Sequence, residues 1–120
     1  MKDLEETTLY RTIPYPLKKA DRFLLRLRGL MFRKKPLQEE GIWITPCNSI
    51  HMFFMRFSID AVFLDREQRV IKLIPDLHPW KMTLPVRHAH SVIELPSGSI
   101  RRLGIKEAQI IGCTEKEPGV

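Results

Sequence analysis

A series of short apolar runs constrains the fold of this chain more than any other feature of its sequence. Each run holds residues that favour strands and is closed by proline, glycine or polar residues that favour turns. The runs are residues 42–45, 61–64, 70–74, 90–95 and 109–113. This pattern predicts a sheet of short strands joined mainly by turns.

The connections between these runs carry signals of their own. The polar residues 65–69 separate two runs and favour a β-hairpin with a loop of about four or five residues. Residues 75–89 contain three prolines and predict a long irregular connection. Ser99 to Leu103 predicts a short helix that ends at Gly104.

The segment from Lys18 to Lys35 is basic and has a helical period. Its apolar residues recur three and four positions apart, as on one face of a helix. They are Ala20, Phe23, Leu24, Leu27, Leu30 and Met31. Pro16 suits the start of such a helix and Gly29 its end or a kink. The sequence therefore predicts an amphipathic helix near the N-terminus.

These elements together predict an α+β fold. A helix followed by neighbouring strands with short turns favours a mostly antiparallel sheet, curled or barrel-like, with the N-terminal amphipathic helix and the short second helix. The length of 120 residues fits a single domain over 1–120. We expect a core of about 20–112, with frayed ends at 1–8 and 114–120.

The charge is concentrated near the N-terminus. The net charge is +6, and residues 1–35 hold ten of the 20 basic residues but only four of the 14 acidic ones. A basic patch on the predicted helix comprises Lys18, Lys19, Arg22 and Arg26. It is either a solvated helix face or a surface for an acidic partner or an anionic membrane. Nucleic acid is disfavoured, because only Phe23 and Phe32 interleave with these charges.

Several classes of protein lack support in the sequence. The acidic start has no apolar core of a signal peptide, and no run approaches the roughly 18 apolar residues of a membrane span. The expected location is therefore the cytoplasm. No glycine-rich phosphate loop or Gly-x-Ser-x-Gly motif is present, which disfavours a nucleotide-driven enzyme.

Residues 41–65, GIWITPCNSIHMFFMRFSIDAVFLD, resemble the signature of the DUF192 family, also called UPF0127. Residues 28–33 and 94–98 resemble its Gly-Leu-Met and Glu-Leu-Pro-x-Gly elements. The resemblance implies a compact, largely β fold with a helix, and it implies no activity or cofactor. Met52 and Ser58 depart from the family pattern, which usually has threonine and proline there.

Four charged residues lie within apolar sequence: Arg28, Arg56, Asp60 and Glu94. A buried charge needs a partner, because burying it alone is costly. One interpretation is a structural network in which Arg56 and Asp60 pair across a bend. The other is a cleft in which the arginines bind an anion and Asp60 or Glu94 acts as a general acid or base.

Cysteine and histidine offer further candidates. Cys47, His51 and Met55 are either core residues, Cu(I) ligands on one face, or, for Cys47 and His51, a nucleophile with its base. Three histidines in the irregular region could bind zinc: His78, His88 and His90. The core interpretation is favoured, and no metal or cofactor is predicted.

Three functional hypotheses follow. The first is a binding module whose cleft holds a small polar or anionic ligand through Arg28, Cys47, His51, Arg56, Asp60 and Glu94. The second is a small enzyme that uses Cys47 with His51, or Asp60 with Glu94, with or without a metal. The third is an interaction protein that docks through the basic segment 18–35.

Overall fold

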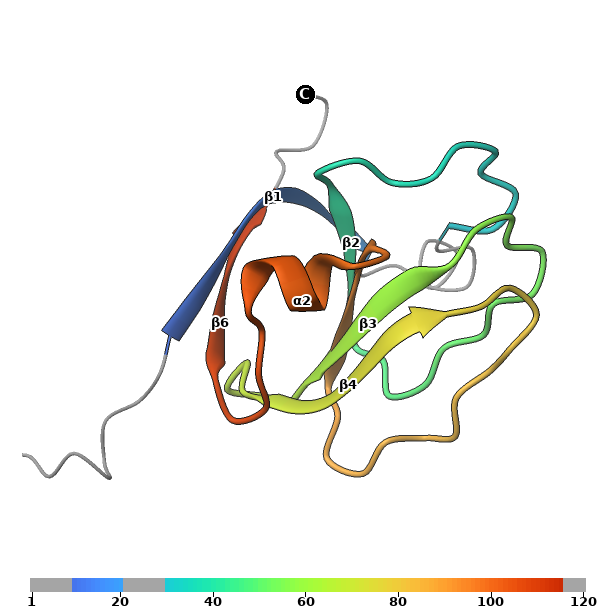
Figure 1. Ribbon diagram of the computed structural model, residues 1–120. Coiled ribbons are helices and arrows are strands. Elements are labelled where there is room, and N and C mark those ends of the chain that lie inside the picture. The colour runs from blue at the N-terminus through green and yellow to red at the C-terminus, as the bar shows by residue number, and fades with distance from the viewer. Residues whose placement is uncertain (1–9, 21–29, 116–120) are drawn as a thin grey trace, which may run out of the picture.

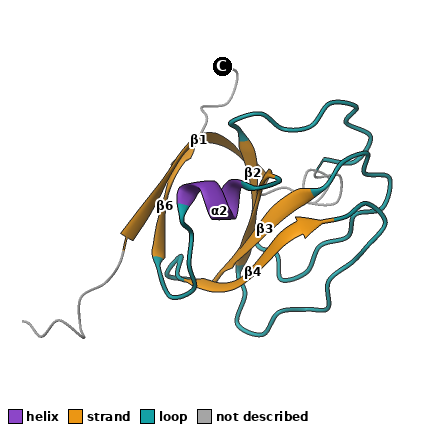
Figure 2. Ribbon diagram, in the orientation of Figure 1, coloured by secondary structure: helices purple, strands orange, loops and turns teal. Residues whose placement is uncertain are grey.

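The computed structural model describes residues 10–20 and 30–115 of the chain. Within these ranges six strands form one mixed sheet in the order β4-β3-β5-β2-β1-β6 (Figure 1). The elements are β1 (Tyr10–Ala20), β2 (Gly41–Ile44), β3 (Ile59–Leu64), β4 (Val70–Leu77), β5 (Ser91–Pro96), α2 (Ser99–Leu103) and β6 (Ile110–Glu115). The described part of the chain is mostly strand with little helix (Figure 2).

The sheet is mixed, with three antiparallel and two parallel strand pairs. β1 pairs in parallel with both β2 and β6, whereas β2, β3, β4 and β5 pair with one another antiparallel. The predicted hairpin at 61–74 is present as the β3–β4 pair. The prediction failed for the parallel pairs because they join strands that are far apart in the sequence. No turn motif in the sequence indicates such a pairing.

The two edge strands approach each other at one end, so the sheet curls into a half-barrel. Arg69 and Ile110 form an isolated bridge, and the Val70 N–H donates to the Gln109 carbonyl at 2.8 Å. The Ile111 N–H donates to the Gln68 carbonyl at 2.9 Å. These bonds link the start of β4 to the start of β6, which confirms the predicted curl.

The start of the predicted N-terminal helix is wrong, because Lys18, Lys19 and Ala20 belong to β1. Ile13, Tyr15 and Leu17 are buried while the residues between them are exposed, which is the period of a strand. Residues 21–29 lie outside the described residues, and the chain resumes in a turn at Leu30.

The structure describes only part of the two chain ends that were predicted to be frayed. Residues 114 and 115 belong to β6 and do not form a frayed end, whereas 1–8 and 116–120 lie outside the described ranges. The short second helix is confirmed as α2, which ends at Gly104 in the left-handed conformation. No helix in the described ranges has both the length and the apolarity to cross a bilayer.

Apolar side chains are buried on both faces of the sheet. One cluster, which includes Leu17, Val62 and Ile93, also contains Ile105, directly after α2. The other cluster, on the opposite face, is covered by loop residues such as Ile50 and Met52. Among the described residues, loops rather than a helix cover this second face.

Candidate functional site

The antiparallel pairing of β3 with β5 builds the candidate site. Leu64, the last residue of β3, lies opposite Ser91, the first residue of β5. The His90 N–H donates to the Leu64 carbonyl at 2.7 Å. The turn that follows β3 therefore lies beside the residues that precede β5, although more than twenty positions separate them in the sequence.

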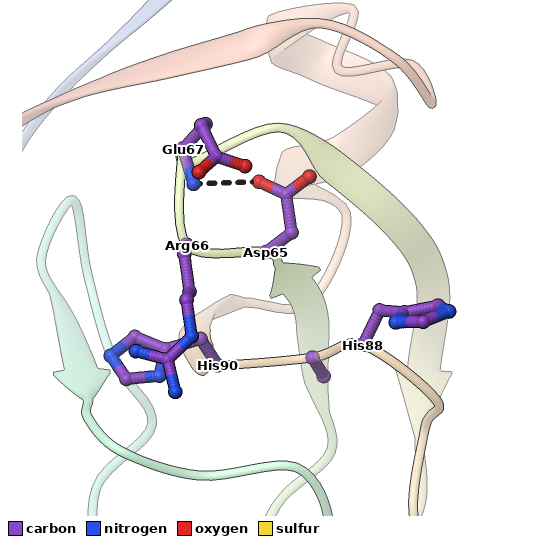
Figure 3. Close-up of a pocket in the computed structure, with 6 residues that line it drawn as sticks. Asp65, Arg66, Glu67, His88 and His90 are labelled. Carbon is purple, nitrogen blue, oxygen red and sulfur yellow. Dashed lines mark hydrogen bonds between the residues drawn. The ribbon is translucent and has the colours of Figure 1, made fainter.

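A pocket of about 400 Å³ lies between these two segments (Figure 3). Its lining residues are Asp65, Arg66, Glu67, His88, Ala89 and His90. A second pocket of about 260 Å³ adjoins it, because both are lined by Ala89 and His90. Pro46, Cys47 and Asn48 complete the second pocket. The first volume lies within the range of small-molecule sites.

Three nitrogen-bearing side chains of the first pocket have no protein partner within the described ranges. No ion pair or side-chain hydrogen bond there involves the Arg66 guanidinium or the imidazoles of His88 and His90. His88 has a left-handed backbone (φ 70°), an uncommon conformation for a residue other than glycine. Unpaired donors around a pocket can bind an oxyanion, and a guanidinium can do so bidentately.

The pocket also has an acidic side. In Figure 3 the Arg66 and His90 side chains point away from the carboxylates of Asp65 and Glu67, and the His88 side chain lies on the other side of the view. The Asp65 Oδ1 atom accepts hydrogen bonds from the backbone N–H groups of Glu67 and Arg69, both at 2.9 Å. The pocket is therefore lined by both donors and carboxylate acceptors.

Asp60, a predicted site residue, has a structural position. It is fully buried on β3. Its Oδ1 atom accepts a hydrogen bond from the Asp76 N–H at 2.9 Å, and its Oδ2 atom accepts one from the Ile100 N–H at 2.7 Å. Since Gly98 offers no side chain to cap α2, the Asp60 carboxylate performs that task from a neighbouring strand. The predicted pair with Arg56 is wrong.

Glu94 is buried on β5, with only 4% of its surface exposed. Its register partners are Ile42 on β2 and Ala61 on β3. Desolvation raises the pKa of the Glu94 carboxyl from 4.5 to about 7. No ion pair or side-chain hydrogen bond to Glu94 occurs within the described ranges.

The structure does not bring the predicted cleft together. Glu94 shares a sheet face with Ala61, whereas Asp60, the neighbour of Ala61 on β3, points to the other face. The two carboxylates therefore cannot act as a catalytic pair. Arg56 is exposed in a loop, and Arg28 lies outside the described residues.

No hydrogen bond between Cys47 and His51 occurs within the described ranges. The Cys47 thiol donates to the Ser49 carbonyl at 3.0 Å. The His51 Nδ1 atom accepts a hydrogen bond from the Phe53 N–H at 3.3 Å, and the two rings stack with centroids 5.0 Å apart. Both side chains therefore serve local turns. Met55 is a core residue, as the favoured interpretation predicted.

The histidines are not gathered into a metal site. His78 contacts Asp76 and Ser58, at 3.4 Å and 3.2 Å, and does not line the pocket of His88 and His90. Across the described ranges, no group of three histidine, cysteine, aspartate or glutamate residues is placed to hold a metal ion.

The predicted basic patch is only partly described. Lys18 is exposed on β1, and the Lys19 ammonium lies 5.3 Å from the centroid of the Trp43 ring. Arg22 and Arg26 lie outside the described residues. A helical face that joins the four residues cannot begin at Lys18, because this residue is in a strand.

Sequence reasoning missed Arg66 as a pocket residue, together with its neighbours Asp65 and Glu67. Arg66 lies in the polar turn 65–69, which was predicted as a hairpin loop and nothing more. His88 and His90 were singled out, but as zinc ligands. Only the β3–β5 pairing brings them to the same pocket as Arg66, and no local sequence signal predicts that pairing.

Comparisons with known proteins find relatives of this chain. A profile of the DUF192 family, described as Uncharacterized ACR, matches residues 7–112. A UPF0127 protein of Thermococcus kodakarensis is 37% identical over 106 residues, which cover 84% of this chain and 66% of the relative. A UPF0127 protein of Pyrococcus horikoshii is 43% identical over 84 residues, which cover 66% of this chain and 70% of the relative. The chain thus spans about two thirds of the length of these relatives.

Solved structures share the fold. A crystal structure of a protein of unknown function from Novosphingobium aromaticivorans has a TM-score of 0.70 and 27% identity, with 78% of this chain and 71% of that chain covered. A crystal structure of a putative transcription regulator from Sinorhizobium meliloti has a TM-score of 0.69 and 19% identity, with 77% of this chain and 76% of that chain covered. The second likeness concerns the fold alone.

Proposed function

The chain belongs to the DUF192 (UPF0127) family of uncharacterised proteins, and from that premise we propose that it is a binding module for a small polar molecule. The ligand binds in the pocket between the β3–β4 turn and the start of β5. The proposal rests on the Arg66, His88 and His90 side chains, which line this pocket and have no partner among the described residues. This site replaces the cleft predicted from the sequence.

The chemistry of the lining defines the ligand class. The Arg66 guanidinium and the His90 imidazole suit a carboxylate or phosphate group. Asp65 and Glu67 would repel a purely anionic molecule, so the ligand also carries hydroxyl or amino groups that donate toward these carboxylates. The ligand class is therefore a small molecule that combines an oxyanion with hydrogen-bond donors.

Melting temperatures measured with matched probes test this proposal. Glutamate is compared with glutarate, and glycerol phosphate with propyl phosphate, because each pair differs mainly in the donor groups. A ligand present at about 100 times its dissociation constant adds roughly 2.7 kcal/mol to the stability, or several degrees for a domain of this size. We expect the donor-bearing member of at least one pair to give the larger shift.

Variants locate the effect in the pocket. Arg66→Gln should abolish the shift, whereas Arg101→Gln should retain it, because Arg101 is an exposed arginine on α2 that does not line the pocket. Equal shifts in the two variants, or no shift with any probe in the unaltered protein, would contradict the proposal.

A further inference from the structure

The loops on the side of the molecule away from β1 and β6 (Figure 2) carry exposed apolar side chains that form a strip. We call it the apolar strip, and its members are Phe32, Phe53, Phe54, Trp80, Met82 and Leu84. They include every large apolar side chain that is exposed within the described ranges. An exposed apolar patch of this kind marks a surface that contacts something other than water.

The aromatic part of the strip is continuous because three loop segments meet there. The Phe32 ring lies 5.1 Å from the Phe54 ring, and the Trp80 ring lies 5.0 Å from Phe54 and 6.0 Å from Phe53, centroid to centroid. Met82 extends the strip, since it forms a backbone bridge with His51, whose ring stacks on Phe53.

The backbone that carries three of these rings has an unfavourable conformation. Phe32, Phe54 and Trp80 have left-handed backbones, with φ of 66°, 63° and 69°. Bulky residues rarely adopt this conformation, which glycine or asparagine tolerates better. Backbone hydrogen bonds nevertheless join the three segments, from the Phe32 N–H to the Phe54 carbonyl at 3.1 Å and from the Trp80 N–H to the Met52 carbonyl at 2.7 Å. Folding alone does not require aromatic side chains at these positions.

The segments that form the strip carry mainly basic charge, with Glu39, Glu40 and Asp76 at their ends. The segments that form it and continue beyond it, residues 30–38, 41–58 and 77–93, contain no aspartate or glutamate. Their exposed basic residues without an ion pair in the described ranges are Lys34, Lys35, Arg56, Lys81 and Arg87. Lys81 lies between Trp80 and Met82, and Arg56 follows Phe54 by two positions. The partner of this surface is therefore anionic as well as apolar.

We propose that the apolar strip docks this protein on an anionic lipid surface. Its apolar side chains enter the interface between headgroups and acyl chains, and the basic residues around it bind anionic headgroups. Leu84 and Met82, which are 82% and 63% exposed, are its most exposed members. Aliphatic side chains of this kind insert into lipid, whereas base stacking would use only the aromatic members of the strip. The surface involves none of the residues that line the Arg66 pocket.

Sedimentation with vesicles tests this inference. The full chain is mixed with vesicles of phosphatidylcholine alone or of phosphatidylcholine with phosphatidylglycerol. We expect binding to the anionic vesicles only, with a loss of affinity as salt approaches about 1 M, where charges are screened within about 3 Å. Vesicle binding that does not depend on lipid charge or salt would overturn the proposal. Tight binding of a single-stranded oligonucleotide together with an absence of vesicle binding would also overturn it.

Matched variants separate the charge from the apolar contribution. Lys81→Glu should weaken binding roughly 30-fold, given about 1 kcal/mol per basic residue near an anionic surface. Lys72→Glu, the same change on an exposed residue of β4, should leave binding nearly unchanged. Leu84→Ser should weaken binding roughly ten-fold through lost apolar insertion. Equal binding of both lysine variants, or full binding by Leu84→Ser, contradicts the docking.

Trp80→Asn distinguishes docking from a role in folding. Asparagine tolerates the left-handed backbone of this position, so the melting temperature should stay the same or rise while vesicle binding falls. A lower melting temperature with unchanged vesicle binding would show that the indole supports the fold and would overturn its docking role.

Discussion

Replacing Asp60 by alanine is expected to lower the free energy of unfolding by about 4 kcal/mol, because hydrogen bonds to a charged group contribute about 1.5–3 kcal/mol each. The fully buried carboxylate accepts hydrogen bonds from two backbone N–H groups, those of Asp76 and Ile100. Its loss leaves the start of α2 without a cap and leaves both N–H groups without their acceptor. Urea denaturation measures the change, and hydrogen exchange should accelerate at both amides.

Asp65→Ala serves as the matched control. The Asp65 carboxylate also accepts two backbone N–H groups, but in a turn that is open to solvent, where water can replace it. We expect a loss of about 1 kcal/mol for this variant. A loss below about 1 kcal/mol for Asp60→Ala would contradict the structural role of Asp60.

Glu94 should make the protein less stable as pH rises. The folded-state pKa of this carboxyl is about 7 and its ordinary value is 4.5. Between these two values the folded chain holds a proton that the unfolded chain releases, so the free energy of unfolding falls with rising pH. The loss begins above about pH 4.5, is complete above about pH 7, and amounts to about 3 kcal/mol.

Glu94→Gln should remove this pH dependence. The amide cannot ionise, so at pH 8 the variant should be more stable than the unaltered protein, by up to about 3 kcal/mol. Denaturation curves at pH 5 and pH 8 measure the effect. Glu67→Gln, at an exposed position, provides the control and should keep the original slope. Equal pH slopes for Glu94→Gln and the unaltered protein would show that burial does not hold the Glu94 proton.

Local signals made part of the fold predictable from the sequence. The β3–β4 hairpin follows from two apolar runs around a polar turn, and α2 follows from a short segment that ends at Gly104. The strand β1 could have been found from the alternation of Ile13, Tyr15 and Leu17, but its prolines conceal that alternation. A register shift between Thr12 and Pro16 accommodates these prolines in the sheet.

The candidate site was harder to predict because it depends on pairing between distant segments. Arg66 and His90 become neighbours only when β3 pairs with β5. Asp60 and Glu94 were recognised as unusual buried charges, but the period of two along the strands places them on opposite faces. The apolar strip was not predicted either, because it also depends on contacts between distant segments. Phe32, Phe54 and Trp80 come from three separate loops.

Nuclear magnetic resonance of the ¹⁵N-labelled protein tests most directly whether the Arg66 pocket binds a small polar molecule. The spectrum is followed while glutamate, glutarate, glycerol phosphate and propyl phosphate are added in turn. The account predicts saturable shifts at residues 65–67 and 88–90 with a donor-bearing probe, and their loss in Arg66→Gln. Shifts centred elsewhere, or none with any probe, would contradict it.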